Sequence, residues 1–282
     1  VVEEEMAVAG SGPSLLPFFR ACEVGLALCV LVTFVPLETR AGVSVGSDTP
    51  RLGMGASSMS EAHNGSLLVE YFEAFLRDRD LDAFRNRVAA RYNQGTLCRI
   101  LSISADVAAR RAAVLSLGIF GSFAQSNTAL GQALRDRDAA VRSMAEDALW
   151  AIWFRADRPE HNLMLEKVRL AISRRELVQA EMLVTRLIAA APNFAEAYNQ
   201  RAIIYCLQGR FGESVQDCQS VLSRNPYHFG AISGMAGCQF ELKRPHDALK
   251  TLRRALKLQP YHTSLRETIR VLETEIEPDG SR

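Results

Sequence analysis

Histidine and cysteine are the side chains of this chain best suited to bind a metal ion. The six cysteines show neither the CxxC spacing of a zinc site nor a disulfide framework. Two of the five histidines, His228 and His262, each end a Pro-Tyr-His triplet, and the triplets recur after 34 residues. A metal site needs further donors that converge on the same point, and the sequence places none there. We therefore expect no metal and no cofactor, and a packing role for Tyr227 and Tyr261 on successive loops.

Motifs that bind nucleotides or catalytic zinc are missing as well. The sequence contains no GxGxxG, Walker A or HExxH pattern. We therefore predict that the protein is not an enzyme, and that its function lies in the surfaces that its fold presents to partners.

A 34-residue period runs through the C-terminal half of the chain. Pro192, Pro226 and Pro260 mark this period. The repeats that it defines span 161–194, 195–228 and 229–262. Small or medium-sized side chains recur where two helices of a hairpin would meet most closely: Val168, Ala202 and Ala236, then Ala180, Ser214 and Ala248, then Leu187, Val221 and Ala255. The period predicts a stack of helical hairpins.

The middle repeat, AEAYNQRAIIYCLQGRFGESVQDCQSVLSRNP, resembles the tetratricopeptide repeat (TPR) family. That resemblance implies a right-handed all-α solenoid, in which the first helix of each hairpin lines a concave groove that binds a protein or peptide. A carboxylate clamp is not expected, since Leu165 and Arg169 replace the Lys and Asn that it uses. The groove residues that the resemblance implies are Asn162, Leu165, Arg169, Glu196, Asn199, Ile203, Leu207, Gly230, Ser233, Gly237 and Phe240.

Three glycines in the third groove helix have two interpretations. Gly230, Gly234 and Gly237 each lower the helix propensity by up to about 1 kcal/mol. Either they make room for a side chain of the partner, or they allow tight packing on the preceding hairpin.

A looser 32-residue period precedes the TPR repeats. Asp106 and Arg110 recur as Asp138 and Arg142 in similar surroundings. This pattern resembles HEAT-like repeats, and the resemblance implies a ladder of Asp–Arg hydrogen bonds between stacked hairpins. The helical stripes at 66–103 would form a degenerate capping repeat. The whole architecture resembles bacterial proteins that fuse HEAT-like and TPR repeats, and HEAT-like repeats of bilin lyases keep a lyase-type enzyme as a further alternative.

The chain is expected to divide into four parts. Residues 1–60 form a poorly structured extension, 61–157 the HEAT-like repeats, 158–276 the TPR repeats with a capping helix, and 277–282 a tail. The extension contains an apolar segment at 15–38, which is interpreted as a membrane anchor, a cleaved signal, or part of a mis-assigned start. Helices are expected near 67–77, 80–92, 96–103, 107–120, 126–135 and 139–155, then in pairs through the TPR repeats, with a last helix at 263–276.

Charge gives little reason to expect nucleic acid as a partner. The net charge is +1, and basic residues gather in the last TPR hairpin, where they are expected to face solvent on the convex side. The leading hypothesis is a cytoplasmic, non-catalytic scaffold or adaptor. The alternative is an assembly factor tethered to a membrane through residues 15–38.

Aromatic residues gather at the junction of the two repeat types. Leu149, Trp150, Trp153 and Phe154 follow helical spacing just before the first TPR hairpin. We expect them to stack on the helix that begins near Leu163 and so to join both parts into one continuous solenoid.

Overall fold

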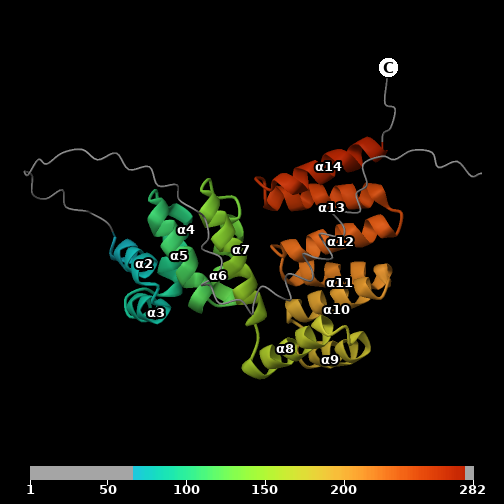
Figure 1. Ribbon diagram of the computed structural model, residues 1–282, viewed down its shortest axis with the longest axis horizontal. Coiled ribbons are helices and arrows are strands. Elements are labelled where there is room, and N and C mark those ends of the chain that lie inside the picture. The colour runs from blue at the N-terminus through green and yellow to red at the C-terminus, as the bar shows by residue number, and fades with distance from the viewer. Residues whose placement is uncertain (1–65, 277–282) are drawn as a thin grey trace, which may run out of the picture.

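The computed structural model describes residues 66–276, which fold as a series of helices (Figure 1). The first six are α2 (Leu67–Asp78), α3 (Leu81–Ala89), α4 (Gln94–Ile103), α5 (Val107–Phe120), α6 (Phe123–Ala133) and α7 (Ala139–Phe154). The remaining seven are α8 (Pro159–Ser173), α9 (Leu177–Ala190), α10 (Ala195–Leu207), α11 (Phe211–Arg224), α12 (Phe229–Glu241), α13 (Pro245–Leu258) and α14 (Thr263–Ile276). No strand occurs in this range. The predicted all-α helical-repeat fold is confirmed.

The C-terminal unit, α8–α14, repeats its backbone geometry every 34 residues. Arg175, Gly209 and Lys243 occupy equivalent turns between the helices of successive hairpins, and all three are left-handed, with φ of 61°, 74° and 59°. The small positions predicted from the sequence are buried: Ala202 is 3% exposed and Ala236 is 0% exposed. The 34-residue register is therefore confirmed. Each hairpin buries its small side chains because only these allow the helices to approach closely.

The N-terminal unit, α2–α7, has its own core. Asp80, Asn93, Asp106 and Asp138 cap α3, α4, α5 and α7, each accepting a hydrogen bond from a backbone N–H of the first turn. Helix α5 packs against α4 and α7, and α2 and α3 cover its other side. The helices that the sequence predicts here are present, with bounds that differ by three residues or fewer.

Arginines repeat their contacts after 32 residues in this unit. Arg110 donates from Nη1 to the carbonyls of Ser104 and Ala105 at 3.0 and 3.2 Å. Arg142 donates to the carbonyls of Asp136 and Arg137 at 2.8 and 3.0 Å, at the same sequence offsets.

The ion pairs between the two hairpins differ from the predicted ladder. Arg110 forms a bidentate pair with Asp136, and Arg111 forms one with Asp138. Asp106 acts as a helix cap instead of a rung. The ladder therefore exists, but the partners of its arginines were predicted wrongly.

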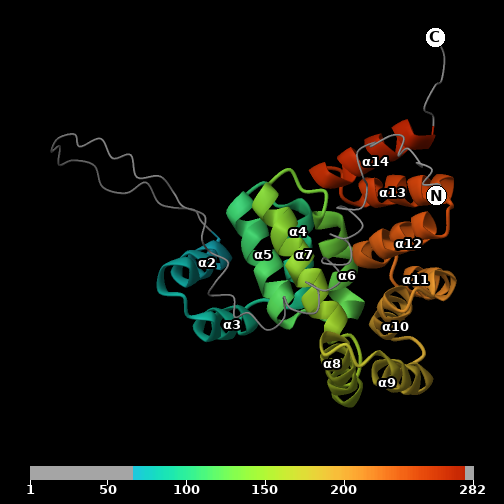
Figure 2. The ribbon, with the colours of Figure 1, turned by 45° about the vertical axis from the view of Figure 1, so that its right-hand side comes forward.

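The two units lie side by side and do not form one continuous solenoid. In Figures 1 and 2, α6 and α7 lie beside the ends of α10 and α12, while α8 and α9 form the lower end of the array. Trp150 and Trp153 contact His228 and Phe229 at the start of α12, with centroid distances of 4.3 to 5.3 Å. The expectation that both tryptophans stack near Leu163 was wrong.

The reason is a reversal of the chain after α7. Phe154 packs in the core of α8–α11 as expected, but the following loop turns α8 away, and Leu163 remains 59% exposed. The tryptophans then face the inter-repeat loops of the C-terminal unit. Tyr227, Phe229 and Leu258 from that unit pack against the N-terminal core.

Several sequence predictions fall outside the described residues. These include the extension at 1–60, its apolar segment at 15–38, and a Gly-Val-Ser-Val-Gly match to the GxSxG pattern at 42–46. Within residues 66–276, no helix has the length and apolar character needed to cross a membrane. The division into domains stays an interpretation.

Candidate functional site

The predicted groove residues fall into a buried group and a half-buried group. Leu165, Arg169, Glu196, Asn199 and Ile203 are all 3% exposed or less, so the expectation that Arg169, Asn199 and Ile203 form an exposed floor was wrong. The half-buried group consists of Asn162, Leu207, Gly230, Ser233, Gly237 and Phe240.

Contacts within the chain account for part of this burial. Arg169 lies over the Phe154 ring at 4.1 Å and pairs with Glu166 at 2.9 Å. Asn162 holds the loop before α8 by hydrogen bonds to the backbone of Asp157. The first groove helix is thus used for attachment to the end of α7.

Glu196 is the centre of a buried polar network on α10. Its Oε1 accepts hydrogen bonds from Asn199 at 2.9 Å and from Gln200 at 2.7 Å, and its Oε2 accepts one from His228 at 2.9 Å. Three donors directed at one carboxylate satisfy most of its acceptor capacity. Glu196 therefore links α10 to the first turn of α12.

His228 has a fixed tautomer in this network. Its Nδ1 accepts the backbone N–H of Ala231 at 3.0 Å, so the proton resides on Nε2 and is donated to Glu196. His262 caps α14 in the same way, accepting from Leu265 at 3.2 Å. The repeated Pro-Tyr-His triplet is thus a repeated helix cap.

The tyrosines of the triplets pack on the N-terminal unit. Tyr227 lies against Gly131 of α6, where a side chain at residue 131 would place its Cβ 2.3 Å from the Tyr227 ring. Tyr261 lies under the guanidinium of Arg142, 4.3 Å away. The predicted loop-packing role of both tyrosines is confirmed, with the N-terminal unit as the packing surface.

A second hydrogen-bond chain crosses the joint between the units. The Trp153 indole N–H donates to Asn127 Oδ1 at 2.7 Å, and Asn127 Nδ2 donates to Asn225 Oδ1 at 3.0 Å. Asn225 Oδ1 also accepts the backbone N–H of Tyr227 at 3.2 Å. These bonds fix the orientation of both amides. Asn225 Nδ2 is then left as a buried donor without a hydrogen-bond partner.

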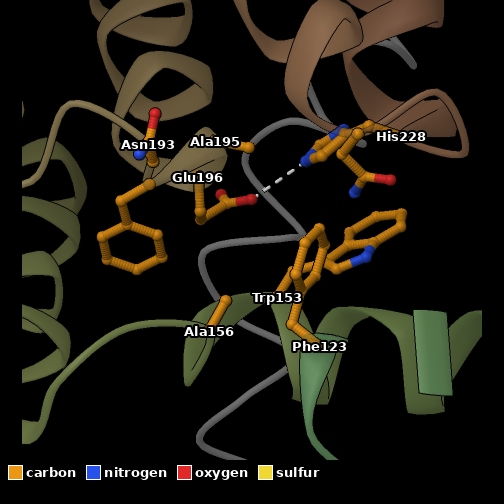
Figure 3. A pocket seen from close by; sticks show the side chains of 9 residues that line it. Phe123, Trp153, Ala156, Asn193, Ala195, Glu196 and His228 are labelled. Atoms are coloured by element: carbon orange, nitrogen blue, oxygen red, sulfur yellow. Dashed lines mark hydrogen bonds and ion pairs between the residues drawn. The ribbon is translucent and has the colours of Figure 1, made fainter. Parts of the chain in front are cut away.

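A pocket of about 30 Å³ lies where the two networks meet. We call it the joint pocket (Figure 3), and its lining residues are Phe123, Trp153, Ala156, Asn193, Phe194, Ala195, Glu196, Asn225 and His228. Figure 3 shows Glu196 facing His228 above Trp153 and Phe123. Of these residues, sequence reasoning assigned only Glu196 to a binding surface. Phe123, Asn127 and Asn225 gave no signal, because their meeting depends on how the two units dock.

The glycines of α12 differ in what surrounds them. A Cβ on Gly230 would lie 2.7 Å from the Trp150 ring, so this glycine permits the docking of α7. A Cβ on Gly234 would meet no heavy atom within 4 Å. Packing therefore explains Gly230, and the packing partner is α7 instead of the preceding hairpin. Gly234 has open space above it.

Thiols gather near this part of α12, on three different helices. Cys238 Sγ contacts Ser214 Oγ at 3.2 Å, and a hydrogen bond from Cys206 contributes most to lowering the pKa of Cys238. Complete burial raises the pKa of Cys218 far above its usual value. Among residues 66–276, no three His, Cys, Asp or Glu side chains are arranged to hold a metal ion.

Comparison with known proteins gives two matches in sequence and two in structure. No family model matches the chain. A TPR repeat-containing protein of Rhizobium etli is 28% identical over 141 residues, which cover 50% of this chain and 69% of that protein. The human WD and tetratricopeptide repeats protein 1 is 33% identical over 85 residues, which cover 29% of this chain but only 13% of its own length. These names support the presence of TPR repeats in this chain.

Solved TPR domains share the fold over less than half of the chain. The first TPR of Spaghetti (RPAP3), bound to the HSP90 peptide SRMEEVD, aligns with a TM-score of 0.41 and 21% identity, covering 43% of this chain and 95% of that domain. The Sgt2 TPR domain of Aspergillus fumigatus aligns with a TM-score of 0.40 and 17% identity, covering 44% and 87%.

Proposed function

We propose that this protein is a non-catalytic scaffold or adaptor, which binds a protein or peptide on the concave side of its TPR array at α10 and α12. The observation that carries the proposal is the open space above Gly234. Glycine in the middle of a helix costs about 1 kcal/mol relative to alanine, and no packing contact within the described residues requires it here. A partner side chain that enters this space gives the glycine a purpose.

The residues around Gly234 form a suitable surface for such a partner. Ser233, Gly237, Phe240 and Leu207 are half-buried, so they combine a fixed position with remaining accessible area. We assign partner binding to this second part of the groove. The buried residues Leu165, Arg169, Glu196, Asn199 and Ile203 would support the surface from below.

The N-terminal unit has a structural part in this proposal. We infer that α4–α7 are two HEAT-like repeats, which the 32-residue recurrence of the Arg110 and Arg142 contacts supports. Two such repeats are few for an independent solenoid. The TPR loops cover their open end, since Tyr261 lies over Arg142. We place the protein in the cytoplasm because its cysteine spacing lacks a disulfide framework.

A matched pair of glycine variants tests the proposed surface. Gly212 lies on α11, the second helix of its hairpin, and also has no heavy atom within 4 Å of an added Cβ. Gly234→Leu and Gly212→Leu should therefore both fold, and both should gain helix propensity. Peptides would be selected from a display library on the full chain, and their affinities measured by calorimetry. We expect Gly234→Leu to weaken binding at least about tenfold, which corresponds to about 1.4 kcal/mol, and Gly212→Leu to leave it unchanged. Equal binding by both variants would place the partner elsewhere.

A further inference from the structure

We propose that the joint pocket recognises a carboxamide group, a site separate from the surface around Gly234. A carboxamide carries one acceptor, its carbonyl oxygen, and at least one N–H donor in the same plane. The pocket presents the complementary pair of groups to it.

The donor of the site is Asn225 Nδ2. The Asn225 side chain is 0% exposed, and its Oδ1 is fixed by Asn127 and by the backbone of Tyr227. Exchanging the amide oxygen and nitrogen would set Asn225 Nδ2 against these two donors, so Nδ2 cannot satisfy itself by a flip. A buried amide donor without an acceptor costs about 1–3 kcal/mol. A ligand that supplies a carbonyl oxygen removes this cost.

The acceptor of the site is Glu196. An ionised carboxylate offers about four lone-pair positions, and its three donors within the chain occupy three of them. The remaining position can accept an N–H from a ligand. Because His228 Nδ1 is committed to the cap of α12, its imidazole is neutral and brings no positive charge to the pocket.

The charges around the pocket favour a neutral ligand. An anion would meet the buried carboxylate of Glu196, and a cation would meet the Asn225 N–H group. Trp153, Phe123 and Phe194 supply aromatic walls for the planar amide and its carbon neighbours. A neutral, planar group with one donor and one acceptor is the match.

The size of the pocket agrees with this assignment. A single water needs about 10–15 Å³ of such space, and the joint pocket has about 30 Å³. This leaves room for the few heavy atoms of a carboxamide, with its substituents toward the rim. The rim includes Asn193, which is exposed, so the group can enter from solvent.

Four small probes of nearly the same shape test the site on the full chain. Acetamide, acetate and acetamidinium differ only in charge and in their donors and acceptors, and N-methylacetamide represents the peptide backbone. Binding would be followed by the NMR signals of the Asn225 side-chain amide and the Trp153 indole. We expect acetamide to shift both signals in a saturable way, with an apparent Kd below about 100 mM, and acetate and acetamidinium to leave them unchanged. Binding of N-methylacetamide as well would assign the group to a peptide backbone, and its failure to bind would assign it to an Asn or Gln side chain.

A pocket-filling variant serves as the control. Ala156 lines the pocket but takes no part in either hydrogen-bond network. Ala156→Leu should abolish the response to acetamide while the melting temperature stays close to that of the wild type. The proposal is overturned if acetate or acetamidinium binds as well as acetamide, or if no probe binds and the pocket holds water only. It is equally overturned if folded Ala156→Leu still responds. None of these results would affect the surface around Gly234, which the glycine pair tests separately.

Discussion

Asn127 provides the sharpest test of how the two units are joined. Its amide is the middle of the chain that connects Trp153 of α7 to Asn225 of the inter-repeat loop, with distances of 2.7 and 3.0 Å. Asn127→Leu keeps the approximate volume of the side chain and removes both hydrogen bonds. The Trp153 N–H then becomes a buried donor without an acceptor, since Trp153 is 2% exposed. Asn225 Oδ1 loses one of its two donors.

The expected cost follows from these two losses. A buried polar group without a partner costs about 1–3 kcal/mol, and the weakened acceptor adds up to about 1 kcal/mol. We therefore expect Asn127→Leu to destabilise the joint by about 2–4 kcal/mol. Both tryptophans of the chain lie at the joint. Their fluorescence in a urea titration should change at lower concentration than the far-UV circular dichroism of the helices.

Gln125→Leu is the matched control, because its side chain is exposed on the same helix. A surface change of this kind should stay within about 0.5 kcal/mol. If Asn127→Leu keeps the wild-type fluorescence transition, the docking of α6 and α7 on the TPR loops is refuted.

Three further predictions concern the repeats themselves. Ala202→Leu should lower stability by about 1–3 kcal/mol in thermal melts, because the site is 3% exposed and has no room for a larger side chain; an unchanged melting temperature would contradict the 34-residue register. Gly209→Ala should destabilise by about 1 kcal/mol because φ is 74° there, whereas Gly212→Ala, in a helix with open space, should stabilise by a similar amount; the same sign for both would show that backbone conformation does not decide the effect. The Arg111 hydrogen bonds contribute most to lowering the pKa of Asp138 from 3.8 to about 2, so their stabilisation is present above pH 4 and is lost as the pH falls toward 2. Arg111→Gln should therefore cost about 1–2 kcal/mol at pH 7, allowing for partial exposure of the pair, and much less at pH 2 in urea titrations; a cost independent of pH would argue against the ion pair.

Local features of the chain could be predicted because neighbouring residues create them. Asp106 and Asp138 cap their helices through contacts two or three residues away, and the left-handed turn at Gly209 follows from the absence of a side chain there. Buried positions such as Ala202 were predictable because a 34-residue period and small side chains occur together. The groove failed as a prediction where it assumed exposure. Arg169 points into the groove position of its helix, but the end of α7 supplies Phe154 as a cover.

The sequence alone therefore determined the helices, their register and the small side chains at their contacts, since these depend on local spacing and residue size. Tertiary structure decided where the N-terminal unit lies, because the relevant contacts join residues far apart in the chain. Trp153 stacks on His228 at 4.3 Å, and nothing in the spacing of either residue indicates the other. The joint pocket and the donor of Asn225 exist only through that docking. Their chemistry follows from which groups are left unsatisfied when two separately folded surfaces meet.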